Sequence, residues 1–68
     1  MHIVDNIETY CKSHNTSVSK FEESCELGHG TIRLWKLGTQ MPSIRSLMKM
    51  ANFTGIPIDQ WTKEGGVA

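Results

Sequence analysis

The chain has 68 residues and a formal net charge of zero, and 38% of its residues are hydrophobic. A chain of this length forms one small domain, which buries only about 60% of the surface that its unfolded form exposes. Two cysteines allow at most one bridge, which excludes a disulfide scaffold, and no apolar run is long enough to span a membrane. The start of the chain is acidic and lacks the basic flank of a signal peptide. We therefore expect a soluble, cytoplasmic domain.

The first helix is predicted from residue 2 or 3 to residue 14. Ile3, Ile7 and Tyr10 recur at three- and four-residue spacing, which places them on one face of a helix. Polar residues 15–17 then break this pattern. Ser17 is a favourable N-cap for a second helix because its hydroxyl oxygen can accept a hydrogen bond from a free backbone N–H.

Residues 17–38, SVSKFEESCELGHGTIRLWKLG, indicate two short helices joined by a tight turn. The first of these helices should stop within residues 26–28. The second, roughly Gly28 to Leu37, opens with small and polar residues and should end at Gly38. A helix-turn-helix motif reads DNA with the N-terminal part of its second helix, so we regard this segment as the informative one. The apolar residues at helical spacing are Val18, Phe21, Cys25, Ile32 and Trp35.

Two further helices are predicted after this motif. Ser43 should cap a fourth helix that ends at Gly55, and Pro57 favours the start of a short fifth helix through Trp61. Residues 63–68 have no periodicity and contain two adjacent glycines, so we expect a flexible tail after a domain of residues 1–62. The predicted fold class is all-α, with five short helices. The apolar stripe expected on the fourth helix is Ile44, Leu47, Met48 and Ala51, extended by Met50 and Phe53.

The charges are unevenly distributed along the chain. No acidic residue occurs between Leu27 and Ile58, whereas four of the seven basic residues fall there: Arg33, Lys36, Arg45 and Lys49. A neutral protein can therefore present a locally positive face, because surface fields act over a Debye length of about 8 Å at physiological salt.

These residues together resemble the Cro/CI-type (XRE-type) helix-turn-helix domains of phage and bacterial repressors, over nearly the whole chain from Ile3 to about Thr62. GHGTIRLW is similar in particular to small Cro-like proteins of phages of Gram-positive bacteria. The resemblance implies a lambda-repressor-like domain that binds double-stranded operator DNA in the bacterial cytoplasm, at the nucleoid. The positions that carry it are Phe21, Ile32, Trp35, Gly38, Pro42-Ser43, Leu47, Ala51 and Gly55-Ile56-Pro57-Ile58-Asp59.

Four residues depart from the family pattern. Val18 stands where a phosphate-binding Gln is common, and Glu22 replaces the small Ala that usually follows the core aliphatic residue. Glu26 stands at the usual turn Gly, and Lys36 at the usual Glu. The resemblance therefore predicts the fold more firmly than it predicts individual DNA contacts.

By resemblance, the helix around residues 28–37 lies in the major groove of the operator. Arg33 is the strongest candidate for base contact, because its guanidinium can bind guanine bidentately. The alternative for these side chains is an ordinary solvated helix face, and for the hydroxyl residues ordinary capping. The candidates for base contact are His29, Gly30, Arg33 and Leu34. The candidates for backbone contact are Ser17, Val18, Ser19, Thr31, Lys36, Thr39, Gln40 and Arg45.

The far end of the domain offers a candidate dimer interface. Phe53, Ile58 and Trp61 could form an exposed apolar patch, or Trp61 could simply close the core. The resemblance implies a weak or DNA-assisted homodimer on a palindromic operator. The alternative function is a protein-binding helix-turn-helix module, an antirepressor or corepressor that binds a partner repressor. Whether the chain is a complete repressor or the N-terminal domain of a larger one stays open.

No constellation indicates a metal, a cofactor or an enzyme. The two cysteines and three histidines show no Cys-x-x-Cys or His-x-x-x-His pair, and Cys11 and Cys25 fall on apolar faces. We expect both thiols to be buried as small hydrophobic groups.

Overall fold

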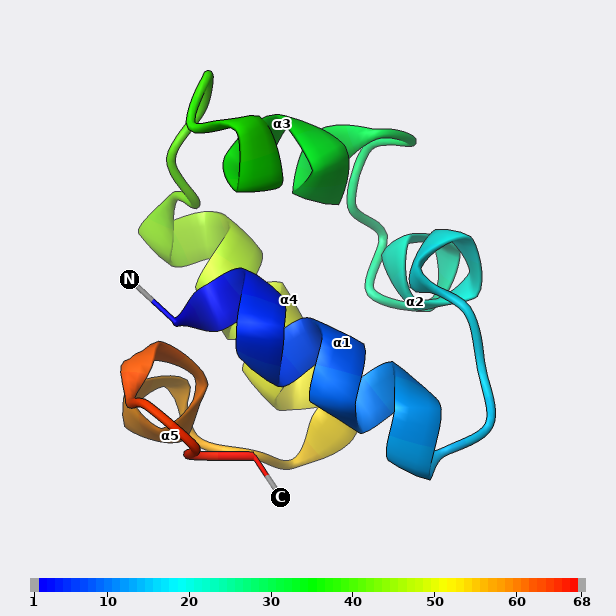
Figure 1. Cartoon of the computed structure of the whole chain (residues 1–68), viewed down its shortest axis with the longest axis vertical. Coiled ribbons are helices and arrows are strands. Elements are labelled where there is room, and N and C mark those ends of the chain that lie inside the picture. The colour runs from blue at the N-terminus through cyan, green and yellow to red at the C-terminus, as the bar shows by residue number, and fades with distance from the viewer. Residues whose placement is uncertain (1, 68) are drawn as a thin grey trace.

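The computed structural model describes residues 2–67, and it contains no strand over that range. The five helices are α1 (Ile3–Ser13), α2 (Val18–Ser24), α3 (Thr31–Leu37), α4 (Ile44–Thr54) and α5 (Ile58–Thr62), shown in Figure 1. The predicted all-α fold with five short helices is therefore confirmed. Within residues 2–67, no helix is both long enough and apolar enough to cross a membrane.

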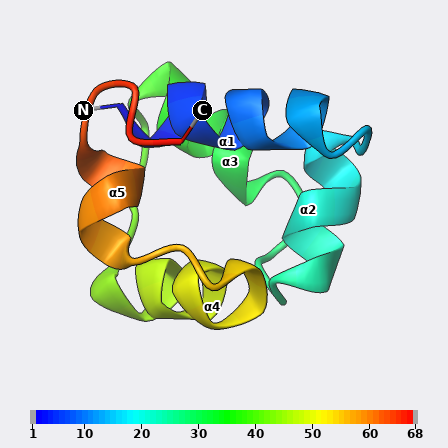
Figure 2. The same cartoon turned by 90° about the horizontal axis from the view of Figure 1, so that it is seen from below.

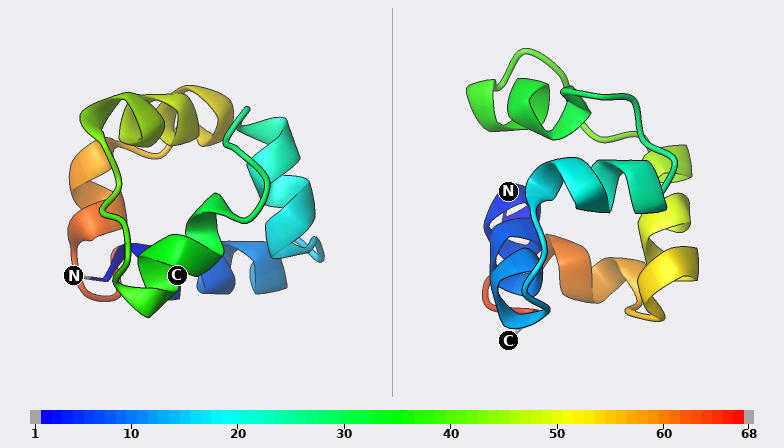
Figure 3. Two further views of the ribbon diagram at one scale, coloured as in Figure 1. Left: turned by 90° about the horizontal axis from the view of Figure 1, so that it is seen from above. Right: turned by 90° about the vertical axis from the view of Figure 1, so that its right-hand side faces the viewer.

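Four helices surround the core, and α3 lies across one end of the group. In Figure 2, α1, α2, α4 and α5 form the sides of a rough square, with α3 behind them. The helix α1 contacts α2, α3 and α5, while α2 also contacts α3, and α4 also contacts α5. The right-hand view of Figure 3 shows that the outer side of α3 faces away from the other helices. This arrangement leaves one long side of α3 available for a partner.

The predicted apolar faces meet in one core. The rings of Tyr10, Phe21 and Trp61 form an aromatic cluster, and the Trp61 centroid lies 5.8 Å from each of the other two. Tilted pairs at such distances are favourable for aromatic rings. The buried apolar residues are Ile3, Ile7, Cys11, Phe21, Cys25, Leu27, Ile32, Trp35, Leu47, Met50, Trp61 and Val67.

The predicted helix caps are present. The Ser17 hydroxyl accepts a hydrogen bond from the Lys20 N–H at 3.1 Å, and the Ser43 hydroxyl accepts one from the Ser46 N–H at 3.1 Å. Gly38 ends α3 with a left-handed φ of 78°. These local signals fix where α2 and α4 begin and where α3 ends.

The third helix begins later than predicted. It starts at Thr31 rather than near Gly28, so His29 and Gly30 lie in the preceding turn. Gly30 has φ 83°, which is outside the helical region and is accessible mainly to glycine. The Thr31 N–H donates to the Gly28 carbonyl at 3.0 Å, which closes the turn.

The segment after α5 packs back onto α1, as Figure 1 shows near the C-terminus. The Asn6 Nδ2 group lies 2.6 Å from the Trp61 carbonyl and 2.9 Å from the Lys63 carbonyl, and the Val67 N–H donates to Asn6 Oδ1 at 3.4 Å. Val67 is also buried. Residues 63–67 therefore pack against α1 along a specific path, although their sequence has no periodicity. Residue 68 lies outside the described residues.

Phe53, Ile58 and Trp61 do not form the exposed patch that the sequence suggested, because Trp61 is buried. Trp61 has no exposed surface, because it fills the space between α1, α2 and α5. Phe53 is 52% exposed, and Ile58 is half-buried against the core. Core closure is the role that the structure gives Trp61.

The fourth helix is also less buried than its sequence predicts. Leu47 and Met50 face the core, but Ile44 and Met48 are exposed. Ile44 and Met48 are four residues apart and so lie on one flank of α4. Part of the expected apolar stripe is therefore surface.

Candidate nucleic-acid interface

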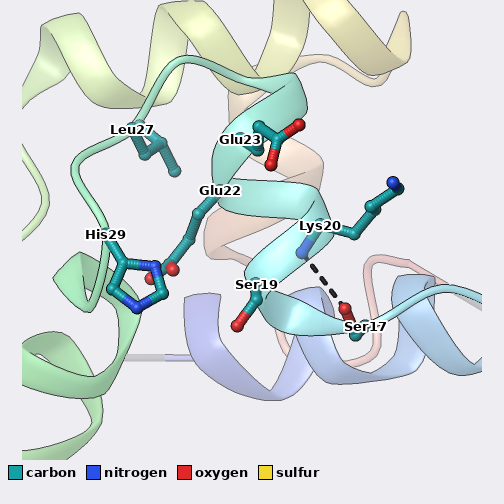
Figure 4. Close-up of a pocket in the computed structure, with 7 residues that line it drawn as sticks. All are labelled: Ser17, Ser19, Lys20, Glu22, Glu23, Leu27 and His29. Atoms are coloured by element: carbon teal, nitrogen blue, oxygen red, sulfur yellow. Dashed lines mark hydrogen bonds between the residues drawn. The ribbon is translucent and has the colours of Figure 1, made fainter.

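Residues of α1, α2 and α3 and of the turn between α2 and α3 line two neighbouring hollows. One hollow lies between α2 and the turn that follows it (Figure 4). The second hollow extends to α3 and shares Ser19, Glu22 and His29 with the first. In the second hollow, the helix-turn-helix packing brings together predicted contact residues that are up to 18 positions apart in sequence, from Val18 to Lys36. The predicted contact residues gathered here are Ser17, Val18, Ser19, His29, Gly30, Arg33 and Lys36.

The outer side of α3 and its preceding turn carries the candidate base contacts. His29 and Arg33 are exposed, and Leu34 is half-buried. On the inner side, Ile32 and Trp35 are buried and attach α3 to the core. The helix is therefore held by one face and presents the other.

The N-terminus of α2 supplies candidate phosphate contacts. The Ser17 oxygen already accepts the capping bond from Lys20, and Ser19 is exposed. Val18 is half-buried, and its side chain cannot replace the hydrogen bonds of the Gln that is common there. Its backbone N–H, in the first turn of α2, is the group that suits a phosphate oxygen.

Three other predicted backbone contacts lie beyond the C-terminal end of α3. Thr39 and Gln40 are exposed in the loop to α4, and Arg45 is exposed in the first turn of α4. The N–H groups of Thr39 and Gln40 both point to the Leu34 carbonyl, at 3.1 and 3.4 Å. Thr39 and Gln40 can therefore donate to DNA only through their side chains. Neither these two residues nor Arg45 lines the hollows beside α2. Thr31, the remaining predicted backbone contact, is half-buried at the start of α3.

The ion pair between Lys36 and Glu8 changes the electrostatics of this surface. Lys36 Nζ lies 2.9 Å from Glu8 Oε2, and both side chains are well exposed. Glu8 also borders the hollow that holds Arg33 and His29. The helix α1 therefore contributes an acidic residue to a surface that the sequence predicted to be basic.

Glu22 holds the start of α3 in place. This residue is buried, and its Oε1 accepts a hydrogen bond from the Gly30 N–H at 3.1 Å. Its Oε2 accepts a second from the Ile32 N–H at 2.9 Å. A carboxylate at a helix N-terminus also interacts favourably with the helix dipole. Figure 4 shows the side chain extending from α2 toward the turn.

Glu22 and Glu26 both depart from the family pattern, and the sequence alone indicates no role for either residue. Glu26 has φ 60°, which explains why a glycine is common at this turn position. Its carbonyl accepts a hydrogen bond from Lys49 Nζ at 3.1 Å. The one sequence signal for Glu22 is an acidic residue at a position where the family usually has a small Ala.

The two cysteines are free and buried, as predicted. Burial, together with the nearby Cys11 thiol, raises the pKa of Cys25 from 9.0 to about 11. Burial and the charge of Glu8 also raise the pKa of Cys11. Within residues 2–67, no group of three or more His, Cys, Asp or Glu side chains is placed to hold a metal ion.

Comparison with known proteins gives one family match. A helix-turn-helix family model matches residues 7–61, which include all of α2, α3 and α4. Neither the curated proteins nor the solved structures contain a significant match. The matched family consists of DNA-binding regulatory domains and not of enzymes. Because the match covers most of the chain and the helices occupy the expected positions, the protein belongs to the XRE-type helix-turn-helix family, whose domains bind double-stranded DNA.

Proposed function

We propose that the protein is a sequence-specific transcriptional regulator, a Cro-like phage repressor that inserts α3 and its preceding turn into the operator major groove. The observation that carries this proposal is that Arg33 on the outer side of α3 and His29 in the preceding turn are exposed beside the N-terminal part of α2. Arg33 would bind guanine O6 and N7, and the first turn of α2 would contact a phosphate. Occupying a promoter would then block RNA polymerase.

The repressor would act as a weak or DNA-assisted homodimer on a palindromic operator. Half-sites one helical turn apart would each receive one α3. With Trp61 in the core, Phe53 and the exposed edge of Ile58 remain from the candidate interface. This small area fits a dimer that forms fully only on DNA.

A matched pair of variants tests the role of α3. The binding site is first obtained by selection from a randomised duplex library with the wild-type protein. Arg33→Ala should weaken binding to that site by about 10- to 100-fold, since a bidentate guanine contact is worth about 1–3 kcal/mol. Lys63→Ala removes the same charge at the C-cap of α5, a helix that lies at the opposite end of the molecule from α3 in Figure 1, and should have little effect. Equal affinities of the two variants would contradict the assignment of Arg33.

A protein-binding role is the second candidate. Several large apolar side chains are exposed on this small domain, and the net charge is zero. Such exposed groups favour contact with a partner such as a repressor. If the protein binds a partner repressor, Arg33→Ala should leave that binding unchanged. The double variant Ile44→Ser and Met48→Ser should abolish it. The exposed apolar residues are Leu37, Met41, Ile44, Met48 and Phe53.

A further inference from the structure

The N-terminus of α3 has no cap within its own segment. Gly30 occupies the N-cap position and has no side chain that could accept a hydrogen bond from the first turn. The first N–H groups of a helix lack intrahelical partners, so a buried start needs acceptors from elsewhere. In this protein the acceptors come from α2, as the two oxygens of the Glu22 carboxylate.

Glu22 is an unusual residue for this location. It is only 3% exposed, so its carboxylate is removed from bulk water. A buried charge is costly unless hydrogen bonds compensate it. Each oxygen has one N–H partner, at 3.1 and 2.9 Å, on the two sides of Thr31. The carboxylate therefore bridges the turn and the first turn of α3.

The bridged segment is the one that carries the candidate base contacts. Gly30 and Ile32 flank Thr31, with His29 directly before them and Arg33 directly after them. A change in the Glu22 bonds would move or loosen the backbone that aims His29 and Arg33. Sequence is read by contacts with base edges, whereas contacts with phosphates carry no sequence information directly.

We propose that Glu22 is a positioning residue for DNA recognition, which fixes the N-terminal end of α3 so that sequence discrimination depends on it. This inference rests on the proposed function. Glu22 touches no DNA itself, and it acts through the Gly30 and Ile32 amides. Its loss should therefore lower affinity for the selected site without lowering affinity for random DNA.

The test uses the full chain with Glu22→Gln, which has nearly the same shape. Its side-chain amide offers one acceptor oxygen and one donor group, so at most one of the two bonds can survive. Glu22→Asp keeps the charge but is one methylene shorter and should not reach both amides. Glu64→Gln is the matched control, because Glu64 is exposed in the segment after α5, borders neither hollow, and loses the same charge. Ile7→Val serves as a second control, a mild destabilisation of the core.

Two readouts are measured for each folded variant. Amide hydrogen exchange without DNA should show faster exchange of Gly30 and Ile32, relative to amides of α1, in Glu22→Gln and Glu22→Asp. The ratio of affinities for selected and random duplex should fall by about tenfold in both, because a lost helix cap is worth about 1 kcal/mol or slightly more. Both controls should keep the wild-type ratio and the wild-type relative exchange.

The outcomes separate this inference from the proposed function. A wild-type protein that does not discriminate between the duplexes contradicts the proposed function and overturns this inference with it. A discriminating wild type with an unchanged ratio in Glu22→Gln overturns the positioning role alone, even if amide exchange becomes faster. A lower ratio with unchanged exchange at Gly30 and Ile32 overturns it as well, because the effect would not pass through the cap.

Discussion

At the scale of single residues, two residues directly after α2 affect the stability of the fold. Glu26 has a left-handed φ of 60° at the end of the turn after α2. Cys25 is a buried thiol whose pKa is raised to about 11. Both features are consequences of how α2 ends, and each leads to a measurable effect on stability.

Replacing Glu26 with glycine should stabilise the protein. A left-handed conformation costs about 1–2 kcal/mol for a residue with a side chain, and the extra freedom of glycine in the unfolded chain offsets part of the gain. We expect Glu26→Gly to raise the free energy of unfolding by about 0.5–1 kcal/mol, measured by urea denaturation. Glu26→Ala removes the same charge but keeps a Cβ, so it should give no such gain. Equal stabilisation by both would show that charge, and not φ, is the cause.

The Cys25 thiol should make stability fall in alkaline solution. Its folded pKa lies above the unfolded value, so the unfolded chain loses its proton first as the pH rises. Stability is therefore fully present below about pH 9 and decreases between there and pH 11, by up to about 3 kcal/mol. Urea denaturation of the wild type across this range should show a steeper decrease than that of Cys25→Ala. The same slope for both proteins would contradict this effect.

At the scale of elements, the position of α3 depends on α2 and α1 as much as on its own sequence. Glu22 of α2 caps its start, and Glu8 of α1 pairs with Lys36 near its end. The sequence predicted the helix from Ile32 and Trp35, which are three positions apart and share its buried face. It did not predict the cap, because the acceptor and the amides are eight and ten positions apart. The late start at Thr31 follows from the φ of Gly30, which periodicity does not indicate.

Removing Glu8 should strengthen DNA binding. The carboxylate borders the α2–α3 hollow and neutralises Lys36, so Glu8→Gln frees one positive charge beside the proposed phosphate path. We expect affinity for selected and random duplexes to rise together, with a steeper dependence on salt, because each phosphate neutralised adds about 0.9 to the slope. Asp59→Asn, which removes the same charge on α5, should leave both affinities close to wild type. A rise for Asp59→Asn as large as for Glu8→Gln would mean that only net charge matters.

At the scale of the whole molecule, α1 and the C-terminal segment are joined by one buried side chain. Asn6 is 2% exposed and lies within hydrogen-bond distance of the carbonyls of residues 60, 61 and 63 and of the Val67 N–H. This contact spans 54 to 61 positions in sequence. A small domain has a small core, so one such connection is a large part of what holds its two ends together.

Asn6→Ala should therefore destabilise the protein strongly. It leaves buried carbonyls without their donor, and we expect a loss of about 2–3 kcal/mol in the free energy of unfolding, measured with urea. Asn52→Ala is the matched control, because Asn52 is exposed on α4 and its loss should change stability by less than about 0.5 kcal/mol. An Asn6→Ala protein as stable as the Asn52→Ala protein would show that the C-terminal segment contributes little.

The sequence predicted the elements well and their long-range partners poorly. The helices, the serine caps and the buried faces follow from local spacing and residue type, as at Ser17, Ser43 and Phe21. The burial of Trp61 does not, because an aromatic residue on a short helix suits a core and an interface equally. Tertiary packing against Tyr10 and Phe21 decides it. The path of the segment 63–67 likewise depends on Asn6, which no local pattern could indicate.

One titration tests most directly whether α3 recognises a specific DNA sequence. The wild-type protein is titrated with the selected duplex and with a random duplex over a series of salt concentrations. We predict that the selected duplex binds at least about a thousandfold more tightly. The logarithm of affinity should also fall linearly with the logarithm of salt concentration. Equal and weak binding of both duplexes at low salt would contradict the claim and would direct attention to a protein partner instead.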